Sequence, residues 1–276
     1  MLKNDSVWMG HTRREALRGL FGAVAFGFGG VLGHRRAIAD ALPKTIEKTI
    51  ELSPFEREMF DHCRAFDTSL DDRLEPGAIA HFVRQSYTRA QSFGFTLRGP
   101  TRTFIELSLM FGSAFDTDPQ YPWAERILRG PGEEMVKATA LYDETMRYRR
   151  HISFWAERRA LVRWESERWD PPVLGESRLV DAMVNRMQRL FPEKATYVGA
   201  EALGALAREA ILESEHRELS SPSAKALMVA LFFALGHGVT RDALYPMIGA
   251  ALQEKRDREA RLRRTVAGWV ARTLRW

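Results

Sequence analysis

The chain has 276 residues, of which 41 are Lys or Arg and 36 are Asp or Glu, giving a formal net charge of +5 at pH 7. Its single cysteine, Cys63, excludes an internal disulfide, and a chain of this length can bury a core that needs none. The sequence contains no P-loop, dinucleotide fingerprint, G-x-S-x-G, H-E-x-x-H or C-x-x-C motif, so it indicates none of the catalytic classes that these motifs define.

The N-terminal segment has its parts in the order of an export signal. The stretch TRREALR contains Arg13 and Arg14, an uncharged run follows over residues 19–33, and an A-x-A cleavage pattern ends at Ala39. The arginine pair resembles the twin-arginine (Tat) signal, which implies export of a folded protein to the periplasm. The uncharged run is shorter than the roughly 20 residues that span a bilayer. We therefore expect residues 1–39 to be a signal peptide cleaved near Ala39; its retention as an anchor is the alternative.

The same segment carries most of the positive charge. Residues 1–39 contain six bases and two acids, so cleavage leaves residues 40–276 with a net charge of about +1. Strong basicity is a main sequence sign of nucleic-acid binding, and the mature chain lacks it. The sequence thus predicts a periplasmic domain over residues 40–276 with no nucleic-acid partner.

Beyond the signal, apolar residues recur at the three- and four-residue spacing of amphipathic helices. Ser53, Pro54 and Glu56 form a capping box that starts the first helix, and Cys63 falls on its apolar face and is expected to be buried. Further helices are predicted over residues 76–93, 101–112, 132–168, 176–190, 197–216, 222–235 and 246–274. The piece 132–168 is unusually long and is expected to break near His151 or to project as an arm. No segment alternates convincingly as a strand, so the fold class predicted is all-α, in a single domain.

Two helix–loop–helix segments resemble each other. FGSAFDTDPQYPW at residues 111–123 aligns without gaps on LGHGVTRDALYPM at residues 235–247. The matched pairs are Gly112 with Gly236, Asp118 with Asp242, Tyr121 with Tyr245, and Pro122 with Pro246. We predict an internal repeat, about 101–128 and 225–252, that forms two related halves around the long central helix.

The matched residues have structural explanations. Glycines suit left-handed helix terminators, aspartates cap the following turn, prolines open the next helix, and tyrosines bury a ring. The loops differ at Asp116 and Trp123, where Trp123 is expected to be exposed, and at His237 between two glycines. The candidate binding residues are therefore Asp116, Asp118, Tyr121, Trp123, His237, Asp242 and Tyr245.

A metal centre is a further hypothesis. Asp116 and Asp118, two residues apart, could hold a hard cation or share a proton, although Asp-x-Asp-Pro is equally an ordinary capped turn. Glu213 and His216 make one E-x-x-H motif, whereas a di-iron bundle needs two. The metal and any cofactor stay unknown at this stage, and a shared site would require the two loops to face each other.

Two other segments offer surfaces. The aromatic and arginine-rich stretch 142–169 is either an interface or a helix wrapped by both halves. The C-terminal helix carries a stripe of Leu262, Val266 and Trp269 with arginines largely elsewhere. It docks on the protein's own core or makes a peripheral contact with an anionic membrane surface.

The leading functional hypothesis is an exported periplasmic binding protein of the accessory, adaptor or toxin-neutralising type. Its expected partner is another envelope protein, and the sequence leaves the oligomeric state open. The alternative is a cofactor- or metal-dependent enzyme exported in its folded state, with a site between the two loops. That site would use Asp116, Asp118, His216, His237 and Asp242.

Overall fold

The computed structural model describes residues 50–273 except 69, 75, 153–160, 165–170, 172–174 and 254–255. The predicted signal peptide, residues 1–39, lies outside the described residues. In the described part all regular elements are helices, so the all-α prediction is confirmed. The helices are α2 (Pro54–Phe66), α3 (Leu70–Arg73), α4 (Pro76–Ser92), α5 (Arg98–Phe111), α6 (Pro122–Arg129), α7 (Glu134–His151), α9 (Glu176–Leu190), α10 (Pro192–Val198), α11 (Ala200–His216), α12 (Pro222–Leu235), α13 (Pro246–Gln253) and α14 (Arg258–Thr273).

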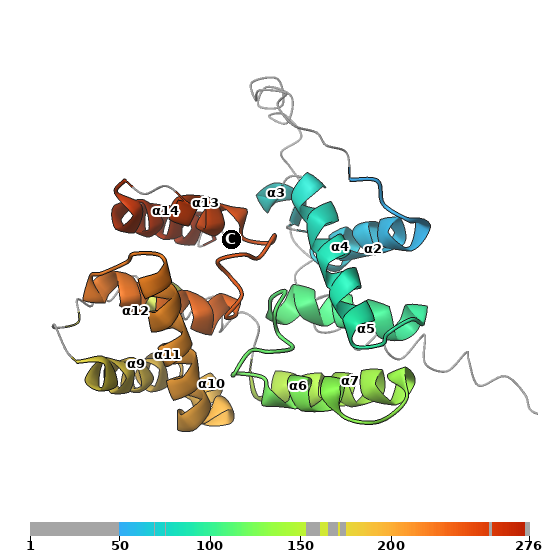
Figure 1. The fold of residues 1–276 in the computed structure, drawn as a ribbon, viewed down its shortest axis with the longest axis horizontal. Helices are drawn as coiled ribbons and strands as arrows, with labels where there is room; N and C mark the ends of the chain where they lie inside the picture. Colours follow the sequence, from blue (N-terminus) through green and yellow to red (C-terminus); the bar gives the residue numbers. More distant parts are fainter. Residues whose placement is uncertain are drawn as a thin grey trace, which may run out of the picture.

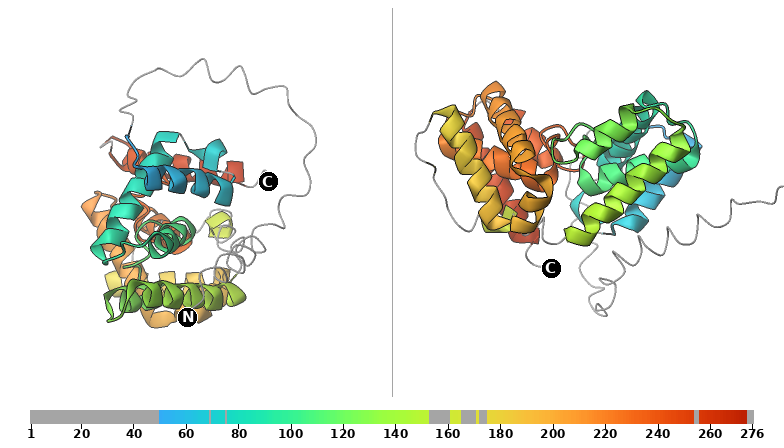
Figure 2. Two further views of the ribbon diagram at one scale, coloured as in Figure 1. Left: turned by 90° about the vertical axis from the view of Figure 1, so that its right-hand side faces the viewer. Right: turned by 90° about the horizontal axis from the view of Figure 1, so that it is seen from below.

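The helices form two lobes (Figure 1). Helices α2 to α7 make the N-terminal lobe, and α9 to α14 make the C-terminal lobe. Seen from below, the lobes lie on either side of a junction where the α5–α6 loop meets the α12–α13 loop (Figure 2). All the candidate residues predicted from the sequence except His216 lie on or beside this junction.

The two lobes contain helices of matching lengths. Helices α4 and α11 have 17 residues each, α5 and α12 have 14, and α6 and α13 have 8. Helix α4 packs on α5 as α11 packs on α12, and α6 packs on α7 as α13 packs on α14. The likeness thus includes a helix before each predicted repeat segment. The internal repeat itself stays a prediction.

An aromatic cluster connects the lobes. The ring of Tyr148 on α7 is 5.3 Å from that of Phe111, 5.6 Å from that of Tyr121 and 5.1 Å from that of Tyr197 on α10. Tyr148 has no exposed surface. Because buried aromatic rings remove large apolar areas from water, this cluster fixes α10 of one lobe against α7 of the other.

Three predicted helix boundaries need revision. The predicted helix 132–168 starts as α7 and ends at His151, where a break was expected; Ile152 is extended, and residues 153–160 lie outside the described residues. Helix α7 is therefore a member of the N-terminal lobe and not a central axis. Predicted helix 197–216 divides at Gly199, whose φ of 87° no helix allows, and 246–274 divides before Asp257, whose φ is 54°.

The C-terminal helix docks on the protein itself. Leu262 and Val266 have no exposed surface, and Trp269 is 6% exposed. The apolar stripe of α14 is thus already covered by the core, and a membrane contact through this helix would have to use its exposed arginines. No helix within the described ranges is long and apolar enough to cross a membrane. The expected burial of Cys63 is confirmed, and burial raises the pKa of its thiol to about 12.

Candidate functional site

The two loops cross at a pair of glycines. Gly112 has φ 98° and ψ 153°, and Gly236 has φ 96° and ψ 152°. A Cβ atom on Gly112 would lie 2.9 Å from the carbonyl oxygen of Leu235, and one on Gly236 would lie 2.7 Å from that of Phe111. The predicted left-handed αL termination is therefore wrong, because these residues occupy a more extended region that is essentially reserved for glycine. In addition, the backbone of the other loop fills the space that a side chain would need.

Two aspartates tie each loop to the other. The Oδ2 atom of Asp118 accepts a hydrogen bond from the backbone N–H of His237 at 2.8 Å, and Oδ2 of Asp242 accepts one from the N–H of Ser113 at 2.8 Å. Each Oδ1 atom accepts from the amide two residues further on, Gln120 or Leu244, at 2.9 Å. The predicted capping role is confirmed, and the cross-loop bonds add a second role.

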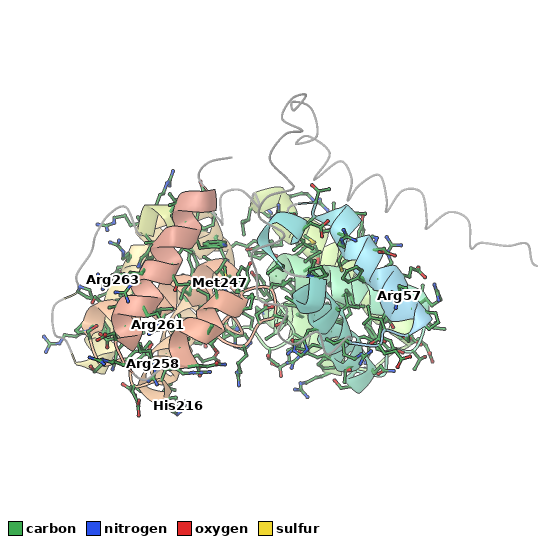
Figure 3. The ribbon with its side chains drawn as sticks, turned by 90° about the horizontal axis from the view of Figure 1, so that it is seen from above. Arg57, His216, Met247, Arg258, Arg261 and Arg263 are labelled. Carbon is green, nitrogen blue, oxygen red and sulfur yellow. The ribbon has the colours of Figure 1, made fainter. Side chains whose placement is uncertain are left out.

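These bonds bear on the metal hypothesis. Burial raises the pKa of both the Asp118 and the Asp242 carboxyl groups, and their backbone hydrogen bonds offset this only in part. The loops do face each other, but the two carboxylates are engaged by backbone N–H groups. Among the described residues no group of three or more His, Cys, Asp or Glu side chains could hold a metal ion. His216 lies exposed at the outer edge of the C-terminal lobe, near Arg258 (Figure 3).

His237 bridges the junction with its ring. Its Nδ1 atom is 3.1 Å from Oε2 of Glu209 on α11, and its Nε2 atom is 3.1 Å from the carbonyl oxygen of Ala114 and 3.1 Å from Oγ1 of Thr117. Burial by itself lowers the pKa of His237, but the hydrogen bond to Glu209 and the charges of Asp118 and Glu209 outweigh it, so the pKa is raised. When it is protonated, the ring can donate to Glu209 in one lobe and to Ala114 in the other.

Asp116 faces a different neighbour from Asp118. It is 0% exposed, and its Oδ1 atom accepts a hydrogen bond of 2.7 Å from Nε of Arg89 on α4. Its Oδ2 atom is buried, and the structure gives it no hydrogen-bond partner. The two acids of the Asp-x-Asp motif are thus not a shared pair. A buried, unpartnered carboxylate oxygen is unfavourable for folding, so Asp116 calls for another explanation.

Asp116 and Arg89 lie in a surface depression of the N-terminal lobe. Its volume is about 630 Å³, and the remaining lining residues are Ser92, Phe93, Leu128 and Arg129. The guanidinium carbon of Arg129 is 6.0 Å from the ring centre of Phe93, and its Nε atom donates to Glu125 at 2.9 Å. The depression thus combines two guanidinium groups, a buried carboxylate and apolar surface, within the size range of ligand sites.

The C-terminal lobe provides an internal comparison. Thr240 aligns with Asp116, and at the same spacing Glu213 of α11 corresponds to Arg89. There the Thr240 hydroxyl donates to Oε1 of Glu213 at 2.8 Å, and Nε of Arg217 donates to the same oxygen at 3.0 Å. A neutral side chain therefore satisfies this loop position. The helix supplies an acid to this position in the C-terminal lobe and a base in the N-terminal lobe.

The other candidate residues belong to the core. Tyr121 is 3% exposed, and Trp123, predicted to be exposed, is only 6% exposed because Phe111 packs against it at 5.9 Å. Tyr245 is partly buried, with its ring 6.1 Å from that of Trp269. The structural explanation of the two tyrosines therefore holds, and the expected exposure of Trp123 is wrong. Arg89 was not predicted as a site residue, because its partner Asp116 lies on another element. If the alignment of the two repeat segments is extended toward the N-terminus, Arg89 aligns with Glu213.

Three exposed apolar residues follow the two segments that line the depression. Leu97 is 51% exposed, Met135 38% and Val136 64%; the remaining large apolar residue that is exposed in the described part is Leu212. The carboxylate of Glu134 accepts the Leu97 N–H at 2.9 Å and so ties the start of α5 to the start of α7. Single exposed apolar residues are normal, but a group indicates a contact surface.

We call the depression and the Leu97–Met135–Val136 patch together the Asp116 corner. Both groups of residues come from the same two segments of the chain, 89–97 and 128–136. Comparison of the chain with models of protein families, with curated proteins and with solved structures found no match.

Proposed function

We propose that this chain is an exported periplasmic binding protein that acts by holding another envelope protein at the Asp116 corner. The observation that carries the proposal is the buried Asp116 oxygen without a partner, in a depression with Arg89 and Arg129. In the other loop the corresponding position holds a neutral residue, Thr240, which pairs with an acid. The twin-arginine resemblance of the N-terminus supports export.

The composition of the corner favours recognition. Arginine, aromatic residues and methionine are enriched where proteins bind one another, and Phe93, Arg129 and Met135 supply one of each. The patch provides apolar area, and the depression provides charged groups with unused hydrogen-bonding capacity. The alternative of an enzyme site between the loops receives less support, because Asp118 and Asp242 are engaged by the backbone.

The test is capture of a partner by the mature protein purified from the periplasm of its own host, followed by two matched variants. Val136→Asp places a charge in the patch at a 64% exposed position, so folding should be unaffected, and we expect partner capture to be lost. Leu212→Asp makes the same change at a 49% exposed leucine of the other lobe and should leave capture intact. A partner captured equally by both variants, or no stoichiometric partner at all, would contradict the proposal.

A further inference from the structure

We propose that the depression of the Asp116 corner recognises the C-terminus of a polypeptide, with Arg89 and Arg129 holding its carboxylate and Asp116 accepting its last backbone N–H. This inference rests on the proposed function and names the chemical group of the partner that the corner binds.

The first step is the supply of donors. Arg89 uses Nε for Asp116 and one Nη for Thr117, at 3.4 Å, while its side chain is 39% exposed. A guanidinium has five N–H donors, so N–H groups of Arg89 stay available at the surface. Arg129 is 62% exposed, and its pair with Glu125 is an exposed intrahelical one. Such pairs are weak, so a ligand carboxylate can replace Glu125.

The second step is the acceptor. The Oδ2 atom of Asp116 needs a hydrogen-bond donor, and it has essentially no exposed surface in this conformation. Binding therefore requires a side-chain movement, such as a turn of Arg89 toward the incoming carboxylate, that opens this oxygen to the ligand. Half-exposed side chains change rotamer within nanoseconds, so this movement is no barrier to binding.

The third step is the match to a chain end. A C-terminal residue carries a carboxylate and a backbone N–H on the same α-carbon, which is the complement of two guanidiniums beside a carboxylate. An Asp or Glu side chain places its carboxylate farther from any N–H group, and inorganic phosphate has no N–H at all. The apolar lining, Phe93 and Leu128, favours an apolar last side chain.

The experiment measures binding of three short acetylated peptides ending in leucine to the mature protein by calorimetry. The first has a free carboxylate, the second is its amide, and the third is the free acid with the last N–H methylated. We expect the free acid to bind at least about tenfold more tightly than either analogue. Equal binding of the acid and its amide, or competition by inorganic phosphate as strong as that by the peptide, would overturn the inference.

Variants assign the contacts. Arg129→Gln should weaken the free acid at least about fivefold, whereas Arg126→Gln, on the same helix and 74% exposed, should not. Asp116→Thr copies the residue that the other lobe has at this position, so we expect it to fold, which its melting curve checks. It should abolish the discrimination against the methylated peptide, and discrimination that persists would remove Asp116 from the site.

Two outcomes separate this inference from the proposed function. Partner capture that depends on Val136 but survives extension of the partner's C-terminus would leave the function standing and overturn the inference. Discrimination among the peptides without any captured protein would overturn the proposed function and leave the inference standing. The C-terminal carboxylate would then come from free peptides.

Discussion

Replacing Gly236 by alanine is expected to destabilise the protein by about 4 kcal/mol, because both its backbone and its surroundings exclude a side chain. A φ of 96° with ψ 152° lies in a region whose occupation costs a non-glycine residue about 1–3 kcal/mol. The new Cβ atom would also lie 2.7 Å from the carbonyl oxygen of Phe111. Forcing extra atoms into a packed site costs about 1–3 kcal/mol more. This is a large fraction of the roughly 5–15 kcal/mol that stabilises a typical domain.

Two other glycines provide controls for these contributions. Gly94 has φ 81° but open space around its Cβ position, so Gly94→Ala tests backbone strain without a clash and should cost about 1 kcal/mol. Gly77 lies in α4 with no atom within 4 Å, so Gly77→Ala should stabilise the protein by about 0.5–1 kcal/mol. Urea unfolding followed by circular dichroism gives all three differences. If Gly236→Ala costs no more than Gly94→Ala, the loops do not cross as described.

Three other substitutions test the junction and the corner. Asp242→Ala leaves the buried N–H groups of Ser113 and Leu244 without acceptors and should cost about 2–4 kcal/mol in urea unfolding; a loss below 1 kcal/mol would contradict the cross-loop bond. Because the pKa of His237 is raised on folding, its stabilisation is complete below its unfolded pKa of about 6.5 and is lost as pH rises through the folded pKa. The unfolding free energy should therefore fall as the pH rises above about 6.5, and His237→Gln should flatten that fall; an unchanged slope would exclude His237 as its source. Leu97 occupies the N-cap position of α5 without a side-chain cap, so Leu97→Ser should stabilise the protein by about 1 kcal/mol while weakening partner capture, and unaffected capture would remove Leu97 from the contact surface.

Local chemistry made part of the fold predictable. Ser53 and Glu56 form the expected capping box, and prolines start α6 and α13 as predicted, since a residue without an N–H is suited to a first turn. The helix predicted over 176–190 has those bounds in the structure. Such features depend on neighbours within a few residues. They therefore follow from the sequence without knowledge of tertiary contacts.

Long-range geometry could not be predicted in the same way. The capping role of Asp118 and Asp242 could be predicted because the amides that they accept from are two residues further along the chain. Their hydrogen bonds to His237 and Ser113 could not, because these join loops more than 100 residues apart. The burial of Trp123 likewise depends on α5 and the α5–α6 loop folding around it. The Arg89 partner of Asp116 lies on an earlier helix, so nothing in the loop sequence indicates it.

The residues that match between the lobes stabilise the fold, whereas the residues that differ form the proposed site. The matched glycines let the two loops approach each other, and the matched aspartates form hydrogen bonds between the loops. At the corner, the aligned positions hold different residues: Asp116 aligns with Thr240, and Leu97 stands at the N-cap position that Ser221 fills in α12. In both pairs the C-terminal lobe has the residue that suits the fold better, a satisfied hydroxyl or a capping serine. The N-terminal lobe has the buried acid and the exposed leucine, and the partner site that we propose accounts for both.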